Sequence, residues 1–88
     1  MIDLTALKSE LKEFIINESG KEYNPRDIRD DEPLFGEESM LNLDSLDILQ
    51  ISVAIRHKYN KRLNDSKEAM RVLANINTLA NFISKENN

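Results

Sequence analysis

The chain has 88 residues, enough for a single domain (1–88) with one small hydrophobic core. Apolar residues make up 40% and charged residues 32% of the sequence, with only two Gly and two Pro, which favours an all-α fold over a disordered or turn-rich β chain. The sequence has no Cys and one His, which excludes disulfides, thiolate metal sites and clusters of histidine ligands. No apolar run approaches the ~20 residues of a membrane span and the first residues do not resemble a secretory signal, so we expect a cytoplasmic protein.

Charge is distributed unevenly along the chain, whose net charge is -4. Residues 1–44 contain 12 acidic and five basic residues, whereas residues 45–88 contain four acidic and seven basic ones. No sustained stripe of Lys and Arg is present to contact phosphates, so we do not expect nucleic acid as a partner. The acidic excess instead favours basic protein partners, because long-range attraction speeds such encounters.

The first predicted element is an amphipathic helix from Leu4 to Glu18. Its apolar residues recur at helical spacing with charged residues between them; they are Leu4, Leu7, Leu11, Phe14 and Ile15. Asp3 is the expected N-cap, and the pair Ser19-Gly20 is the expected stop.

The stretch from Lys21 to Leu43 has no helical period and contains both prolines, so it is predicted to be a loop. Connections of this length without secondary structure are uncommon in compact domains and are usually functional or disordered. Apolar residues at intervals favour an ordered loop that is held on the core; they are Tyr23, Ile28, Leu34, Phe35, Leu41 and Leu43.

A second helix is predicted to begin at Asp44. Asp44 can cap the backbone N–H of Asp47 while the Asp47 side chain faces back, a variant of the capping box, and both carboxylates favour the positive end of a helix. Its apolar residues cover more than one stripe, so we expect a central helix with several neighbours; they are Ile48, Leu49, Ile51, Val53, Ala54, Ile55 and Tyr59. Asn60 is the expected C-cap.

Two further helices complete the prediction. A short one begins near Asp65, and its apolar face is expected to consist of Ala69, Met70, Val72 and Leu73. Asn75 or Asn77 caps the last helix, whose inward residues are Leu79, Ala80, Phe82 and Ile83. The predicted fold is therefore an all-α four-helix bundle, with three longer helices, one short helix and a long loop between the first two.

The residues do not predict an enzyme. His57 follows Ser45 by 12 positions on one predicted helix, and a rise of ~1.5 Å per residue separates them by about 18 Å, which excludes a Ser-His pair. Neighbouring acids such as Asp30 and Asp31, or Glu37 and Glu38, lie in the predicted loop without an evident apolar pocket to raise a pKa. The two glycines are too few for a phosphate-binding loop.

Ser45 is the residue with the most suggestive position, in the first turn of a capped helix. A hydroxyl there is exposed, and a phosphodiester attached to it would meet the free N–H groups and the positive dipole end of the helix. On these local features alone, the favoured interpretation is an ordinary first-turn serine.

A longer pattern resembles the acyl carrier proteins, in which the serine of an Asp-Ser-Leu motif carries 4′-phosphopantetheine. It includes Leu34-Phe35-Gly36, the run Leu43-Asp44-Ser45-Leu46-Asp47-Ile48-Leu49, and Tyr59. It continues through Leu63 and Asp65 into residues 76–83, which resemble the family's fourth helix. The resemblance therefore covers essentially the whole chain.

This resemblance implies that Ser45 is the attachment site of a 4′-phosphopantetheine arm, which a phosphopantetheinyl transferase (holo synthase) would take from coenzyme A. The arm would hold acyl or biosynthetic intermediates as thioesters in a fatty-acid, polyketide-like or other pathway. The implied partners are acyl-transferring, condensing or reducing enzymes, and the chain itself would be a monomer. The residues expected to contact these partners are Asp44, Leu46, Asp47, Val53 and Arg56.

The sequence departs from the family at the second helix. In typical bacterial fatty-acid carriers the exposed face of this helix is strongly acidic, whereas here the corresponding positions are neutral or basic: Gln50, Arg56, His57 and Lys58. Asn42 also stands where many members have Gly. Partners other than standard fatty-acid synthase enzymes are therefore possible, and the acids of the loop are an alternative negative face.

Two function classes remain open at this point. The chain is either a carrier modified on Ser45 or an unmodified four-helix interaction module that shares the carrier fold. For a carrier, the small residues Ser52, Ala54 and Ala80 are candidates for leaving space for an acyl chain between helices.

Overall fold

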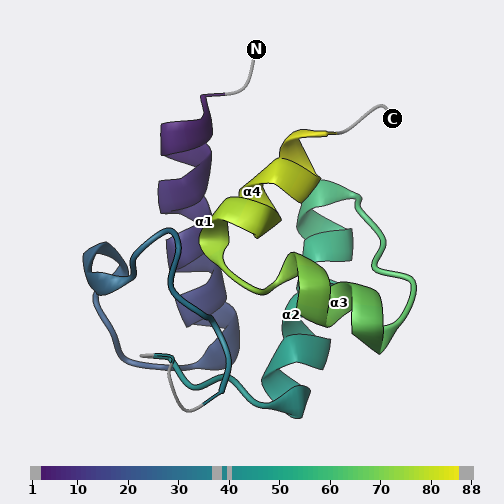
Figure 1. Cartoon of the computed structure of the whole chain (residues 1–88), viewed down its shortest axis with the longest axis horizontal. Coiled ribbons are helices and arrows are strands. Elements are labelled where there is room, and N and C mark those ends of the chain that lie inside the picture. Colours follow the sequence, from purple (N-terminus) through teal and green to yellow (C-terminus); the bar gives the residue numbers. More distant parts are fainter. Residues whose placement is uncertain (1–2, 37–38, 40, 86–88) are drawn as a thin grey trace.

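The structure is a computed structural model that describes residues 3–36, 39 and 41–85. Its α-helices are α1 (Leu4–Ser19), α2 (Ser45–Tyr59), α3 (Ser66–Val72) and α4 (Ile76–Ser84), and a short 3₁₀ helix, η1 (Pro25–Asp27), lies between α1 and α2 (Figure 1). These residues form no strand, only an isolated bridge between Phe35 and Leu43. The all-α prediction is confirmed for the described chain, whereas η1 was not predicted. Glu37 and Glu38, the second pair of neighbouring acids named above, lie outside the described residues.

The helix boundaries follow from local capping chemistry. Asp3 accepts hydrogen bonds from the N–H groups of Thr5 (3.0 Å) and Ala6 (3.3 Å), as predicted for an N-cap. α1 extends one residue beyond the predicted Glu18, and Gly20 ends it with a φ of 72°, a left-handed conformation that glycine adopts without strain. Asn60 likewise ends α2 with a φ of 57°.

The two C-terminal helices also begin at predicted caps. Asp65 accepts from the Glu68 N–H at 2.8 Å, which starts α3. Of the two asparagines considered for α4, Asn75 is the cap, because its side chain accepts from the Thr78 N–H at 2.8 Å while the Thr78 hydroxyl accepts from the Asn75 N–H at 3.2 Å. This reciprocal pair is a capping box.

One hydrophobic core joins the helices. α1 packs against α2 and α4, and α3 packs against α2 and α4 (Figure 1). Each helix contributes residues that are removed from solvent; they include Leu11, Ile15, Ile51, Ile55, Val72, Ile76 and Leu79. At ~25 cal/mol per Å² of apolar surface, burial of these side chains is the main force that holds the helices together.

α2 packs against α1 and α3, in line with the central helix expected from its pattern, but only one of its apolar sides enters the core. Ile48, Ile51 and Ile55 form its buried face, whereas Leu46, Leu49 and Val53 are 73%, 62% and 50% exposed. The helix therefore has a second apolar face that no described element covers. We call Leu46, Leu49 and Val53 the α2 ridge.

Outside α2, two apolar residues that were expected to pack inward are largely exposed. Met70 on α3 is 46% exposed, because the short helix turns only Ala69 and Val72 into the core. Tyr23 is 44% exposed, whereas Ile28, Leu34, Leu41 and Leu43 of the same segment are buried as predicted.

The segment that joins α1 to α2 is held in place by contacts with α1 and with the start of α4. Lys12 Nζ on α1 lies 2.7 Å from Asp30 Oδ1. The backbone carbonyl of Asp30 accepts from the Asn77 N–H at 3.0 Å, and the Leu34 N–H donates to the Ala74 carbonyl at 3.1 Å. These contacts fix the segment against α1 and the start of α4 and so position the residues that lead into Ser45.

Within the described residues, the helices are too short or too polar for any of them to span a bilayer.

Candidate functional site

The start of α2 is organised by two aspartates. The Asp44 side chain accepts from the Asp47 N–H at 2.9 Å, and the Asp47 side chain accepts from the Asp44 N–H at 3.2 Å, which confirms the predicted capping box. The hydrogen bond from the Asp47 N–H lowers the pKa of the Asp44 carboxyl, more than the opposing effect of its partial desolvation. Asp44 therefore caps the helix as a carboxylate at neutral pH.

Ser45 comes directly after this cap as the first residue of α2 and is exposed to solvent. Its hydroxyl forms no hydrogen bond with another residue in the described part of the chain. Because Asp44 and Asp47 satisfy the helix start without it, the hydroxyl is free to react or to be replaced.

A turn ahead of Ser45 depends on a residue that the sequence pattern did not single out. Ser39 is only 8% exposed, and its hydroxyl accepts from the N–H groups of Leu41 and Asn42, both at 3.1 Å. In turns, serine side chains commonly form hydrogen bonds with the backbone two or three residues further along the chain. A serine in the predicted loop was therefore the sequence signal that could have identified this turn. Asn42 adopts a φ of 48°, which explains why Gly suits this position and why Asn is tolerated.

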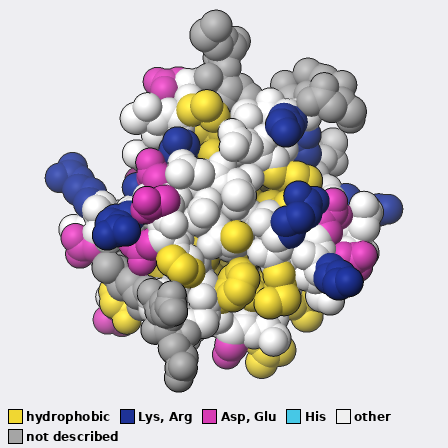
Figure 2. Space-filling model, viewed as in Figure 1, with side chains coloured by type: hydrophobic (Ala, Val, Ile, Leu, Met, Phe, Trp, Pro, Cys, Tyr) yellow, Lys and Arg dark blue, Asp and Glu magenta, His cyan; other side chains and the backbone are white. Residues whose placement is uncertain are grey.

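Beside Ser45, α2 and α3 enclose a hollow of about 320 Å³. Figure 2 shows hydrophobic side chains gathered on this face of the molecule. The hollow is mostly apolar and is lined by Ser45, Ile48, Leu49, Ser52, Leu63, Asn64, Asp65, Ser66, Ala69 and Met70. Of the small residues proposed to leave space for an acyl chain, Ser52 lines this hollow, Ala54 faces a different groove, and Ala80 is fully buried in the core.

Ser66 matches Ser45 in its local surroundings. It is the first residue of α3, it comes directly after the N-cap Asp65, it is exposed, and it lines the same hollow. The two serines differ in the next residue along the chain, since Ser45 precedes the exposed Leu46 and Ser66 precedes Lys67. Ser66 is therefore a matched control for any chemistry assigned to Ser45.

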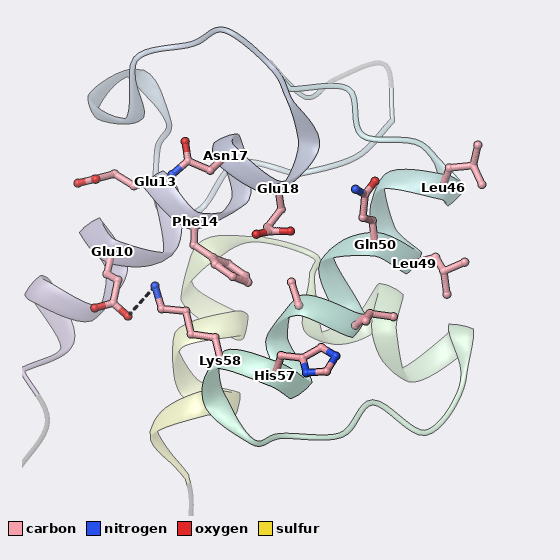
Figure 3. Close-up of a pocket in the computed structure, with 12 residues that line it drawn as sticks. Glu10, Glu13, Phe14, Asn17, Glu18, Leu46, Leu49, Gln50, His57 and Lys58 are labelled. Atoms are coloured by element: carbon pink, nitrogen blue, oxygen red, sulfur yellow. Dashed lines mark ion pairs between the residues drawn. The ribbon is translucent and has the colours of Figure 1, made fainter.

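A wider groove of about 1250 Å³ lies on the other side of α2, against α1. Figure 3 shows Phe14 and Glu18 of α1 directed toward α2, whereas Glu13 points away from it. Three acids and one lysine line it, together with the α2 ridge: Glu10, Glu13, Glu18 and Lys58. The acids of α1 were not singled out from the sequence, because nothing in the local pattern shows which side of α1 faces α2.

One end of this groove is closed by contacts around Lys58. Lys58 Nζ lies 3.9 Å from Glu10 Oε2 and 5.3 Å from the centre of the Phe14 ring (Figure 3). The Tyr59 hydroxyl donates to the same Glu10 carboxylate. Burial, and after it this hydrogen bond, raises the pKa of Tyr59, so the phenol stays protonated and remains a donor.

The structure places the residues expected to contact partners in different parts of the site. Leu46 and Val53 belong to the exposed ridge and line the α1–α2 groove, whereas Asp44 and Asp47 form the cap at the start of α2. Arg56 is exposed but does not line the groove. Lys58, one of the basic positions noted on the second helix, forms an ion pair with Glu10.

The described residues contain no group of three or more His, Cys, Asp or Glu side chains arranged to hold a metal ion. His57 is exposed and lines the α1–α2 groove, whereas Ser45 lines the α2–α3 hollow. The structure thus does not place the two residues in a common pocket.

Comparison of the chain with models of protein families and with curated proteins found no match. The resemblance to acyl carrier proteins therefore rests on the residues of this chain and on the site that they form.

Proposed function

We propose that this chain is an acyl carrier protein with a carrier-type four-helix bundle and a long loop between its first two helices, modified on Ser45 by 4′-phosphopantetheine. The observation that carries the proposal is the free, exposed hydroxyl of Ser45 at a helix start that two aspartates already cap, beside an apolar hollow. Monomeric state and cytoplasmic location belong to the same proposal.

The residues of the site fit such a group. The hydroxyl is accessible to a modifying enzyme, and the first turn of α2 offers the positive end of a helix to a phosphodiester. The hollow between α2 and α3 is apolar enough to receive part of a hydrocarbon chain. When bound, the group supplies a thiol that holds acyl groups as thioesters.

The role of the chain's own residues is to present and to orient. In the attachment step, Ser45 Oγ forms the ester bond to phosphorus and loses its proton to the transferase, while the adenosine bisphosphate part of coenzyme A leaves. Asp44 and Asp47 keep the helix start rigid during this exchange, and the α2 ridge offers contact area to the enzymes that load, elongate or reduce the acyl group.

The test is the intact mass of the protein after incubation with coenzyme A and a broad-specificity phosphopantetheinyl transferase. We expect the gain of one phosphopantetheine in the wild type, no gain in Ser45→Ala, and an unchanged gain in Ser66→Ala. The helical circular dichroism of both variants should match the wild type, because neither hydroxyl caps a helix.

Modification of Ser45→Ala, or its absence from the wild type, would overturn the assignment. The second outcome would favour the rival function, an unmodified interaction module. The observation in favour of this rival is the uncovered α2 ridge, which offers a binding surface whether or not Ser45 is modified.

A further inference from the structure

Four exposed cations form a separate surface on the side of the molecule where α2 ends and α3 begins. They come from three segments: Arg56 from the last turn of α2, Arg62 from the connection that follows, and Lys67 and Arg71 from α3. Figure 2 shows Lys and Arg side chains over the side of the molecule where α3 lies. We call these four residues the cationic face.

On α3, two of these cations flank an exposed apolar side chain. Lys67, Met70 and Arg71 have the spacing of neighbours on one side of a helix, three and four residues apart. Met70 is 46% exposed, whereas Ala69 and Val72 on the opposite side are buried in the core. The outer side of α3 therefore presents an apolar side chain together with two cations.

Arg56 extends the cationic face from α3 to α2. It follows Ser52 by one helical turn, and Ser52 lines the hollow between α2 and α3. Because residues one turn apart share a side of a helix, Arg56 lies on the side of α2 that is turned toward α3. Arg62 lies on the connection between the two helices, so the four cations follow one continuous stretch of surface.

The acids on this side of the molecule are already engaged. Asp65 and Glu68 are the acids of residues 48–85. The Asp65 side chain accepts from the Glu68 N–H at 2.8 Å, and the Glu68 carboxylate accepts from the Asn64 N–H at 2.8 Å and lies 3.5 Å from Arg71 Nη2. The other three cations form no ion pair in the described part of the chain. The cationic face is thus positive even when both acids are counted.

Much of the negative charge of the molecule lies away from the cationic face. Residues 27–32 include four acids, and in Figure 1 this segment lies on the opposite side of the fold from α3. The molecule measures 34 Å along the horizontal axis of that view. At 0.1 M salt the Debye length is only ~10 Å, so these acids are screened from a surface that meets α3. The net charge of -4 therefore does not prevent the cationic face from attracting negative charge.

The cationic face is not part of a pocket. Its four residues line neither the α1–α2 groove, nor the α2–α3 hollow, nor a hollow of about 400 Å³ beside η1. Long cationic side chains on an open surface suit a broad layer of negative charge better than a small anion that needs an enclosing site. The headgroups of an anionic membrane are such a layer, and they attract Lys and Arg side chains near the surface.

We infer that the cationic face binds the surface of an anionic membrane. Its four cations lie among the phosphates of the headgroups, and Met70 enters the boundary between headgroups and acyl chains. Binding is peripheral and reversible, because a few cations and one apolar side chain supply only modest affinity.

This inference adds a location to the proposed function. α3 carries the cationic face and also forms a wall of the hollow beside Ser45, so a carrier bound in this way would hold its acyl group next to lipid. That consequence rests on the proposed function, whereas membrane binding itself does not require the modification. A binding experiment on the unmodified protein therefore succeeds or fails independently of the mass experiment on Ser45.

The test is co-sedimentation of the unmodified full chain with lipid vesicles at about 0.1 M salt, where the Debye length is ~10 Å. Anionic vesicles contain phosphatidylglycerol and phosphatidylcholine in equal parts, and neutral vesicles contain phosphatidylcholine alone. We expect the partition coefficient to be roughly tenfold larger for the anionic vesicles, because the cations supply most of the attraction. Binding should disappear near 1 M salt, where the Debye length falls to ~3 Å.

Two double variants with the same net charge locate the binding surface. Arg62→Gln with Lys67→Gln should weaken binding to anionic vesicles by roughly ten- to thirtyfold, since each cation near the surface contributes about fivefold, or ~1 kcal/mol. Arg26→Gln with Arg29→Gln removes two exposed cations beside η1 and should leave binding unchanged. Both variants should keep the helical circular dichroism of the wild type, because the side chains are exposed and cap no helix.

Met70→Ser tests the apolar part and should weaken binding by roughly threefold, less than the loss of two cations. Several results would overturn the inference: equal binding to anionic and neutral vesicles, an equal loss in the two double variants, or no sedimentation at millimolar lipid. Binding of polyglutamate without binding of anionic vesicles would also overturn it, because the partner would then be an acidic protein.

Discussion

Asp44 shows how a single residue sets the start of the candidate site. Its side chain holds the Asp47 N–H at 2.9 Å, while Ser45 next to it stays free. In this arrangement, the residue that stabilises the helix and the residue proposed to be modified are neighbours with separate tasks. A chemical change on Ser45 therefore need not disturb the cap.

The pKa of Asp44 gives a prediction for pH dependence. Its folded-state pKa is lowered from 3.8, mainly by the hydrogen bond from the Asp47 N–H, so the carboxylate stabilises the folded state fully above pH 3.8. That contribution is lost as pH falls through the lower, folded-state pKa. The chemical shift of the Asp47 amide should therefore titrate with a midpoint below 3.8.

The control for this titration is Asp44→Asn, which can still cap the helix but cannot ionise at this position. In that variant the large acid-induced shift of the Asp47 amide should disappear. A midpoint at or above 3.8 in the wild type would contradict the cap geometry.

At the scale of helices, α4 offers a direct comparison between two candidate caps. Replacing Asn75 by Ala removes the acceptor for the Thr78 N–H and should lower the free energy of unfolding by about 1 kcal/mol. Replacing Asn77 by Ala should change it by less than ~0.5 kcal/mol, since the described contact of Asn77 uses its backbone N–H. Urea unfolding measures both, and a larger loss in Asn77→Ala would show that the wrong residue has been identified as the cap.

Element starts and stops were predictable because their causes are local. Asp3, Asp44 and Asp65 each precede a helical pattern, and Asn60 comes after one. The short helix η1 was missed because three residues are too few for a periodic pattern. The choice between Asn75 and Asn77 was also beyond the sequence, because both precede the apolar residues of α4 at acceptable spacing.

The orientation of α2 could not be predicted for a different reason. Leu49 looks like a core residue in a hydrophobic pattern, and only the placement of α1 and α3 decides which apolar side of α2 is covered. The same placement brings Glu18 near α2 and puts Ser66 beside Ser45 at one hollow. The position of Ser45 at a helix start was predictable, whereas the two surfaces that flank it depend on tertiary packing.

For the whole molecule, the hollow between α2 and α3 predicts that an attached acyl chain stabilises the fold. Each buried methylene contributes ~0.8 kcal/mol, and a gain of 1 kcal/mol raises the Tm of a domain of this size by roughly 4 to 8 °C. An octanoyl form of the modified protein should therefore melt several degrees above the form with a free thiol, as measured by circular dichroism.

A pair of variants locates the acyl chain. Ser52→Leu fills the α2–α3 hollow and should abolish the extra stability of the octanoyl form, whereas Ala54→Leu fills the α1–α2 groove and should leave it intact. Equal melting of the octanoyl and free-thiol forms of the wild type would mean that the chain remains in water.

The hydrogen bonds that tie the segment before α2 to the start of α4 also bear on the order of events during synthesis. Leu34 bonds to Ala74 and Asp30 bonds to Asn77, so residues made early are held by residues made late. While the nascent chain emerges from the ribosome, α1 and α2 can form before the hydrogen bonds that tie their connection to α4 are available. A modifying enzyme that recognises the folded approach to Ser45 would consequently act on finished chains and pass over incomplete ones.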